Sequence, residues 1–334
     1  MTEKKISKKL VIGIVLALAV VISAIIILHQ NRLADPTEEI VKKVISVAVI
    51  AGACMIFVRC YDKITVLPIE LWQSRHRIWK LAKNDFKKRY AGSYLGAVWA
   101  MAQPVVTIAM YYLVFDLVFN SRGPVLSNGR EIPYVLSLTA GLVPWFFFSE
   151  ALNHGTMALL EYNYLVKKVV FKISILPIIK VIGATFIHVF FVLVLLIVAA
   201  FYGFYPSVYT LQLFYYSVCL FIFVLAVCYT TCAIVVFFRD LSQIISIGLQ
   251  IGMWATPILW KLEDLEPKMG EMVNLFKINP LVYIVNGYRS AVYEQQWFFE
   301  DFYSTMYFWI VTVILFGVGA MIFKRLKVHF ADVL

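Results

Sequence analysis

Long apolar runs limit the possible folds of this chain more than any other feature. About 20 apolar residues span the hydrocarbon layer as a helix, and within lipid only helices and closed barrels satisfy every backbone hydrogen bond. The first such run, residues 10–28, contains no charged residue. Charged residues make up only 15% of the chain, against about 25% in an average soluble domain. We therefore predict an all-α polytopic membrane protein.

The charged residues between the runs predict how the chain crosses the membrane. Lys and Arg concentrate in the N-terminus, in 59–89, in 167–180 and in the tail, so the positive-inside rule places these segments and both termini in the cytoplasm. The net charge of +10 is therefore sorted by membrane side and does not indicate a nucleic-acid partner. The first run is long for a signal peptide and lacks a small-residue cleavage site, so we expect it to remain in the protein. The predicted crossings of the cytoplasmic (inner or plasma) membrane are 10–28, 40–58, 94–119, 134–152, 173–203, 210–238, 243–260 and 304–323.

A basic amphipathic segment precedes the third crossing. Trp72, Trp79 and Phe86 recur every seven residues and would form one aromatic stripe on a helix over about 69–90. Cations occupy the opposite face, and Arg89 lies near the end. This pattern is typical of a helix that lies in the headgroup layer, although a basic linker that only sets topology is the alternative. We thus divide the chain into an N-terminal two-helix extension (1–66), an interfacial helix (67–92) and a six-helix domain (93–334).

The last predicted external segment, 261–303, contains a short apolar stretch at 279–293. It begins with Asn279-Pro280 and includes Arg289, and it is too short to span the hydrocarbon. A re-entrant element and an ordinary external helix packed on the crossings both fit this pattern.

Six stretches, taken in order, resemble the permease subunits of polysaccharide ABC exporters, the Wzm and TagG family, which carry O-antigen, capsule or teichoic acid. They are KNDFKKRYAGSYLGAVWAMAQP, AGLVPWFFFSEAL, NYLVKKVVFKISILP, FFRDLSQIISIGLQIGMWATPILW, INPLVYIVNGYR and FKRLKVHFADVL. Two features depart from the family pattern: Lys172 stands where a proline is usual, and residues 1–66 lie outside the six-crossing core.

The resemblance implies a six-helix permease core of the type V ABC fold. It also implies a homodimer that binds two copies of a separate ABC ATPase subunit. The chain contains no Gly-Lys dipeptide and hence no phosphate-binding Walker loop, so we expect no ATPase site of its own. ATP and Mg²⁺ would be bound by the partner. The five cysteines lie in or at the ends of apolar runs, where helix packing explains them more simply than a metal, and we expect neither metal nor cofactor in this chain.

The resemblance also implies a docking site for the ATPase in the cytoplasmic connection 156–168. Its candidate residues are Glu161, Tyr162, Asn163, Lys167 and Lys168. The positive-inside rule alone is an alternative explanation for the two lysines.

Aromatic residues, 16% of the chain, are the candidates for a sugar path. Sugar rings have apolar faces that stack on aromatic rings, and Tyr and Trp also hydrogen-bond to the hydroxyl rim. Interfacial anchoring and lipid contact are the alternative roles. The candidate path residues are Tyr111, Tyr112, Phe115, Trp145, Phe147 and Trp254, and the candidate external gate consists of Pro280, Tyr283 and Arg289.

Few ionisable residues stand out inside the predicted crossings. We expect Asp116 and Glu150 to lie near helix ends and to pair at the interface, and His188 to hydrogen-bond between helices. A membrane glycosyltransferase or acyltransferase would need clustered acids or a His-Asp pair, and an ion-coupled transporter would need midplane charges and inverted repeats. Neither pattern is evident. We therefore predict an exporter permease for a lipid-linked polysaccharide in contact with membrane lipids, and an exporter of a drug or small lipid is the alternative.

Overall fold

The computed structural model describes residues 8–28, 36–89, 91, 92, 94, 96, 98–121, 123–126, 129–167, 172–260, 270 and 273–334. Apart from one isolated bridge between Val125 and Glu131, the regular structure in these ranges is helical. The chain forms two compact units, Met1–Pro68 and Ile69–Leu334.

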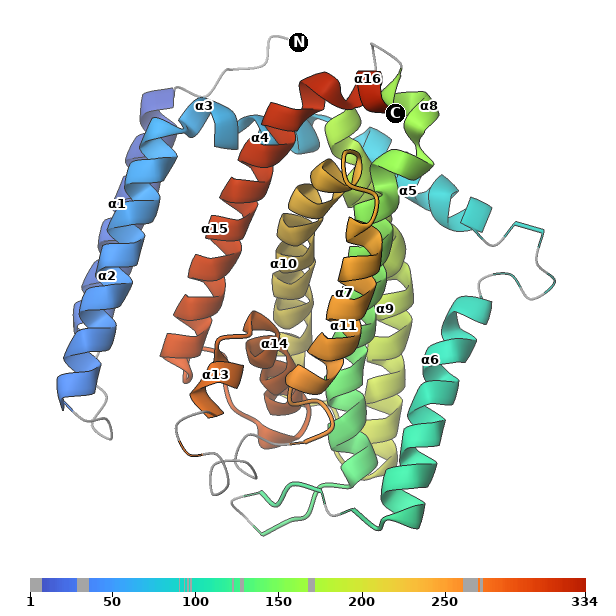
Figure 1. The fold of residues 1–334 in the computed structure, drawn as a ribbon. Helices are drawn as coiled ribbons and strands as arrows, with labels where there is room; N and C mark the ends of the chain where they lie inside the picture. The colour runs from blue at the N-terminus through green and yellow to red at the C-terminus, as the bar shows by residue number, and fades with distance from the viewer. Residues whose placement is uncertain are drawn as a thin grey trace. The chain divides into compact units, whose positions relative to one another are not determined.

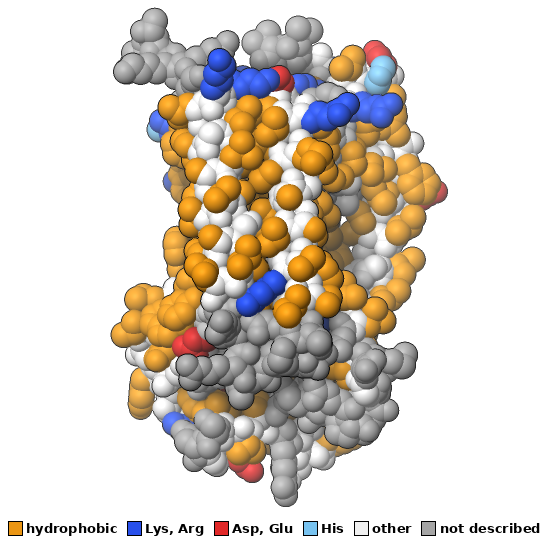
Figure 2. Space-filling model, turned by 90° about the vertical axis from the view of Figure 1, so that its left-hand side faces the viewer, with side chains coloured by type: hydrophobic (Ala, Val, Ile, Leu, Met, Phe, Trp, Pro, Cys, Tyr) orange, Lys and Arg blue, Asp and Glu red, His pale blue; other side chains and the backbone are white. Residues whose placement is uncertain are grey.

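The first unit is an antiparallel pair of long helices. Helix α1 (Lys8–Leu28) and α2 (Pro36–Arg59) are followed by the short α3 (Tyr61–Ile64). Lys8 Nζ lies 2.6 Å from Asp62 Oδ2, which places the start of α1 beside the end of α2. Ile26 is the only buried side chain that the structure describes in α1, and hydrophobic side chains cover much of the face shown in Figure 2. Such a surface suits lipid contact, because apolar side chains that are left exposed within a unit need an apolar solvent.

Six helical stretches among the described residues are long and apolar enough to cross a membrane. Five belong to the second unit, where they run side by side (Figure 1). They contain α6 (Val98–Tyr111) with its π-helical extension η1 (Tyr112–Val118), α7 (Tyr134–Glu161), α9 (Leu176–Phe201), α10 (Gln212–Val235) and α15 (Phe302–Leu326); the sixth is α1. The prediction of an all-α multi-pass chain is confirmed.

Two of the eight predicted crossings are not among these six. Helix α2 covers the predicted second crossing, whose passage through the membrane stays a prediction. The predicted crossing 243–260 contains α11 (Leu241–Ala255), which is shorter than expected. Thr256 adopts extended backbone with ψ 136°, because the residue before a proline, here Pro257, is disfavoured in the helical region. At about 1.5 Å per residue, the 15 residues of α11 span less than the roughly 30 Å of hydrocarbon.

Helix α7 forms the centre of the second unit and packs against α9, α10 and α14 (Pro280–Arg289). Gly155 allows this close approach, since a Cβ there would lie 2.3 Å from the Cys228 sulfur of α10. Gly319 of α15 similarly lies against the Ala226 carbonyl of α10. Small residues at helix contacts are typical of membrane proteins, where hydrophobic burial does not drive one helix against another.

The predicted interfacial helix is interrupted and forms two helices. Helix α4 (Val66–Gln73) is separated from α5 (Arg75–Arg89) by a turn at Ser74. The buried Ser74 hydroxyl accepts a hydrogen bond from Arg77, and Arg75 donates to the Trp72 carbonyl. Serine and charged side chains that bind the backbone or each other locally compete with a continuous helix. Helix α5, α8 (Asn163–Val166) and the C-terminal α16 (Phe330–Val333) all lie at one end of the second unit (Figure 1).

We predict that the N-terminal extension is dispensable for folding of the second unit. A truncated chain beginning at Val66 keeps α4 whole and should insert and purify as a monodisperse, helical protein. Circular dichroism and size-exclusion chromatography in detergent, with the full chain as control, measure this. Aggregation of the truncated chain alone would show that the extension is structurally required.

Candidate functional site

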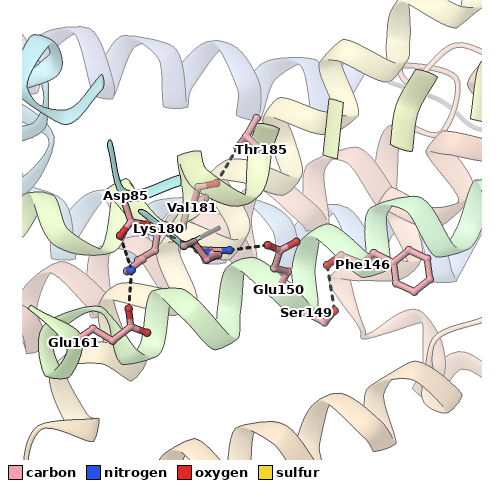
Figure 3. A network of polar contacts seen from close by, with 9 residues as sticks. Asp85, Phe146, Ser149, Glu150, Glu161, Lys180, Val181 and Thr185 are labelled. Atoms are coloured by element: carbon pink, nitrogen blue, oxygen red, sulfur yellow. Dashed lines mark hydrogen bonds and ion pairs between the residues drawn. The ribbon is translucent and has the colours of Figure 1, made fainter. Parts of the chain in front are cut away.

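Lys180 occupies the second turn of α9, inside a membrane-length apolar helix, and its side chain is almost fully buried. Its Nζ lies 2.8 Å from Asp85 Oδ1 of α5 and 2.6 Å from Glu161 Oε2 at the end of α7. Figure 3 shows Lys180 between these two carboxylates. A buried ammonium group is costly unless it is paired and hydrogen-bonded. This requirement brings three elements together: α5, α7 and α9.

A second ion pair continues from the same aspartate. Arg89 at the end of α5 approaches Asp85 Oδ2 at 3.9 Å and donates to Glu150 Oε1 at 2.9 Å. Glu150 lies well inside α7, so the expectation that it sits near a helix end was wrong. The pairing itself was expected. The carboxylate is retained in the apolar helix because the guanidinium supplies its counter-charge.

Tyr162 completes what we call the α5 network, which consists of Asp85, Arg89, Glu150, Glu161, Tyr162 and Lys180. The Tyr162 hydroxyl donates a hydrogen bond to Asp85 Oδ1, and the Lys180 ammonium lies 4.8 Å from the centre of the Tyr162 ring. Burial and the adjacent Asp85 carboxylate raise the pKa of Tyr162 above its usual value, so the hydroxyl remains a donor. Part of the predicted ATPase docking segment is thereby attached to α5.

A smaller set of contacts holds α4. Glu70 accepts a hydrogen bond from Ser174 at the start of the α9 span and lies 3.9 Å from Lys327 near the C-terminus. Lys172, which replaces the proline usual in the resembled family, donates to Gln73 at 3.3 Å. The departure from the family pattern thus adds a contact to α4.

The three rings of the predicted aromatic stripe differ in how far they are exposed. Trp72 is 73% exposed and Trp79 57%, whereas Phe86 is half-buried. Trp79 and Phe86 both contact the Phe186 ring of α9 edge-on. Arg89, predicted on the interfacial helix, points into the bundle toward Glu150. The interfacial position of the helix stays a prediction, and α5 is anchored to the bundle through Asp85 and Arg89, which the stripe did not indicate.

The structure does not gather the six candidate path residues in one place. Trp145 and Phe147 are buried within α7: Trp145 packs on α11 at Gly252, and Phe147 packs on His188 with ring centres 4.6 Å apart. Trp254 is 63% exposed. The half-buried Tyr111, Tyr112 and Phe115 lie on α6 and η1, and Phe115 contacts the Tyr134 ring. Phe147, Glu150 and His188 border a cavity of about 370 Å³ between α6, α7 and α9.

The candidate gate residues lie on α14, which packs into the bundle. Asn279 caps this helix through its side chain, and Pro280 occupies the first turn. The buried Tyr283 hydroxyl bonds Thr305 and Tyr215, and the buried Arg289 donates to the Ile258 carbonyl at 3.0 Å. On the same helix, the Tyr288 hydroxyl lies 2.9 Å from His188 Nε2 of α9. His188 therefore hydrogen-bonds between helices, as expected.

The candidate coupling residues divide into two groups. Glu161 and Tyr162 are engaged with Lys180 and Asp85, whereas Asn163 and Lys167 are exposed. Lys168 lies outside the described residues. Within the described ranges, no cluster of three or more His, Cys, Asp and Glu side chains is arranged to hold a metal.

Two residues of the α5 network were not identified from the sequence. Lys180 is a charge inside a predicted crossing, which is itself a signal of function. Asp85 is the only acid in the basic stretch 75–89. Each is unusual for its segment, and together they would have suggested a pair.

A family model described as ABC-2 type transporter matches residues 76–293, more than half of the chain. The chain belongs to the ABC-2 type transporter family. The O-antigen export system permease protein RfbA of Myxococcus xanthus is 28% identical over 263 residues, which cover 79% of this chain and 97% of the relative. The protein of the same name from Klebsiella pneumoniae is 29% identical over 259 residues, covering 76% and 93%.

These comparisons confirm the resemblance that the six sequence stretches indicated. They also confirm the prediction of a permease, because ABC-2 family membership and the relatives' names both describe the membrane component of a transporter. The match begins within α5, so the α5 network lies inside the part of the chain that defines the family.

We predict that Lys180→Ala lowers the free energy of unfolding by about 3 to 5 kcal/mol, because it breaks the buried ion pair with Asp85. Asp85→Asn in the same chain should recover part of the loss. Lys167→Ala, which removes an exposed lysine at the same end, is the matched control. Chemical unfolding in detergent micelles, followed by circular dichroism, measures all three, and equal stability of Lys180→Ala and wild type would contradict the role of the network.

Proposed function

We propose that this chain is the membrane subunit of an ATP-driven exporter that moves a lipid-linked polysaccharide (O-antigen, capsular polysaccharide or teichoic acid) across the cytoplasmic membrane. Membership of the ABC-2 family supports the transport mechanism, and the names of relatives that the chain covers almost completely support the substrate class. The α5 network is the structural observation that carries the proposal. It connects the 156–168 segment, the candidate for ATPase docking, with the membrane-length helices α7 and α9.

The working unit would be a homodimer with two ATPase subunits. A closed dimer is the commonest way to complete a half-channel, and two exposed apolar faces are available for it. The membrane-length stretch at α6 and η1 has none of its most apolar part buried, and α11 exposes Ile244, Ile247, Ile251 and Trp254 along one side. Pairing of these faces would enclose a path between the two copies.

ATP binding would act on the permease through the 156–168 connection. Asn163, Tyr164 and Lys167 are exposed and would contact the ATPase, while Glu161 and Tyr162 would pass its movement to Lys180 and Asp85. This division refines the earlier expectation that all the candidate residues dock the ATPase. The end that carries α5 and α8 would face the cytoplasm, in agreement with its excess of cations.

The polymer requires a lining of protein or water, because each sugar hydroxyl left unpaired in hydrocarbon costs on the order of several kcal/mol. Tyr111, Tyr112, Phe115 and Trp254 remain the candidates for that lining. The buried Trp145 would join it only if α11 moved away from α7, whereas the buried Phe147 borders the cavity between α6, α7 and α9. Pro280, Tyr283 and Arg289 on α14 would close the outer end. Export of a drug or small lipid remains the alternative substrate class.

We predict that Asn163→Ala with Tyr164→Ala reduces co-purification of the ATPase at least several-fold, because both side chains are exposed at the proposed contact. Tyr162→Phe should retain binding but lower the ATPase stimulation, since it removes only the hydrogen bond to Asp85. The readouts are recovery of the ATPase on tagged permease and phosphate release from the complex. Full recovery with the double variant would place docking elsewhere, and phosphate release by the permease alone would refute a separate ATPase.

Export itself tests the substrate assignment. Tyr112→Ala and Phe115→Ala should lower the amount of long polymer at the cell surface several-fold while the ATPase rate in membranes changes less, because the rings contact sugar and not nucleotide. Phe201→Ala, an exposed ring at the end of α9, is the control. Wild-type surface polymer in both path variants would exclude these rings from the path, and unchanged surface polymer after deletion of the gene would refute the proposed function.

A further inference from the structure

A large cavity lies at the end of the second unit opposite the α5 network, beside α14. Its volume is about 990 Å³, at the upper end of the range of about 300 to 1,000 Å³ typical of ligand sites. Most of the residues that border it belong to three segments: residues 123–125, the helix α14 with its π-helical extension η5 (Ser290–Glu294), and residues 296–307 at the start of α15. We propose that this cavity is a binding site for neutral saccharide units.

The aromatic rings of the cavity offer surfaces on which sugar rings stack. Trp297 is half-buried, contacts the Tyr209 and Phe299 rings, and borders the cavity. Tyr307 is partly exposed, and its hydroxyl donates to the Ile278 carbonyl at 2.5 Å. Fixed rings bind the apolar face of a sugar at little entropic cost, because they lose no further rotamer freedom.

Two polar side chains that border the cavity have hydrogen-bonding atoms without a partner in the described residues. Asn286 is the only residue of 281–289 that is not buried, and it lines the cavity. Its side-chain amide makes no hydrogen bond within the described residues. Arg289 is 6% exposed and also lines the cavity, and its Nε has no hydrogen-bond partner there. Buried polar atoms are nearly always paired in folded proteins, so an unpaired donor beside a cavity indicates an acceptor supplied from outside.

The walls are held in place by contacts made elsewhere. Buried Gln212 at the start of α10 donates to the Gln296 carbonyl at 2.8 Å and accepts from the Phe298 amide at 2.7 Å. Thr305 joins the two walls, since its hydroxyl contacts the Phe298 carbonyl and the Tyr283 hydroxyl. A site whose walls are already fixed loses less entropy when it binds its ligand.

The charges of the lining favour a neutral ligand. Its cationic side chains are Lys277 and Arg289, and its carboxylates are Glu294 and Asp301. These charges balance, whereas recognition of phosphate or of acidic sugars uses an excess of cations. This inference rests on the proposed function, because it places sugar units of the exported polymer at the exit beside α14.

The test uses the full chain with its ATPase partner in lipid nanodiscs. The probe consists of oligosaccharides released by mild acid from the host cell's own surface polysaccharide, and isothermal titration calorimetry measures binding. We expect a Kd of about 1 mM or tighter for the wild type and at least ten-fold weaker binding for Asn286→Leu and Trp297→Ala. Asn286→Leu retains side-chain volume and removes only the amide. Tyr205→Ala, which removes an exposed ring outside the lining, should bind like the wild type.

Equal affinity of the wild type and both cavity variants would overturn the site, as would absence of binding to the wild type at 10 mM probe. Competition by inorganic phosphate would overturn its neutral character. ATPase stimulation in the same nanodiscs shows that each variant is folded. Loss of surface polymer on gene deletion, combined with absence of probe binding, would refute the cavity while leaving the proposed function intact.

Discussion

The buried ammonium group of Lys180 is the constraint on which the arrangement of α5, α7 and α9 depends. An isolated charge in a membrane-length helix would cost several kcal/mol, so Lys180 requires the carboxylates of Asp85 and Glu161. One of these belongs to α5 and the other to the end of α7. Their shared partner determines where α5 lies on α9 and where the chain turns into α8. The Tyr162 hydroxyl and the Arg89–Glu150 pair then follow from the same geometry.

The opposite end of the second unit is held by different chemistry. Tyr283, Tyr215, Thr305 and the Trp309 indole form a chain of neutral hydrogen bonds, and Tyr288 bonds both His188 and Ser217. Neutral hydroxyl contacts can be exchanged for water or sugar hydroxyls at little cost, whereas breaking a buried ion pair leaves an unpaired charge. The end of the unit with the α5 network is therefore suited to transmit movement. At the α14 end, a polar polymer can replace the neutral hydrogen bonds.

The sequence was sufficient for the transmembrane architecture but not for the packing of its amphipathic part. Uninterrupted apolar runs such as 10–28 predict helices directly, because lipid permits little else. Periodicity predicted one aromatic stripe, whose rings the structure divides between α4 and α5. It could not show that Asp85 and Arg89 turn inward, because their partners Lys180 and Glu150 lie on helices distant in the sequence. The dipeptide Thr256-Pro257 was sufficient to predict the early end of α11. The turn at Ser74 depends on local side-chain contacts that composition does not reveal.

Ionic contacts also suit the coupling role better than an apolar contact of the same size. An ion pair has discrete partners, so a network of such pairs has discrete arrangements. Asp85 is shared by Lys180, Arg89 and Tyr162, with the two cations at 2.8 and 3.9 Å. A displacement of Glu161 and Tyr162 by the ATPase would therefore change which groups satisfy Asp85. Because Asp85 belongs to α5, the response would be a movement of that helix against α9, on which it packs.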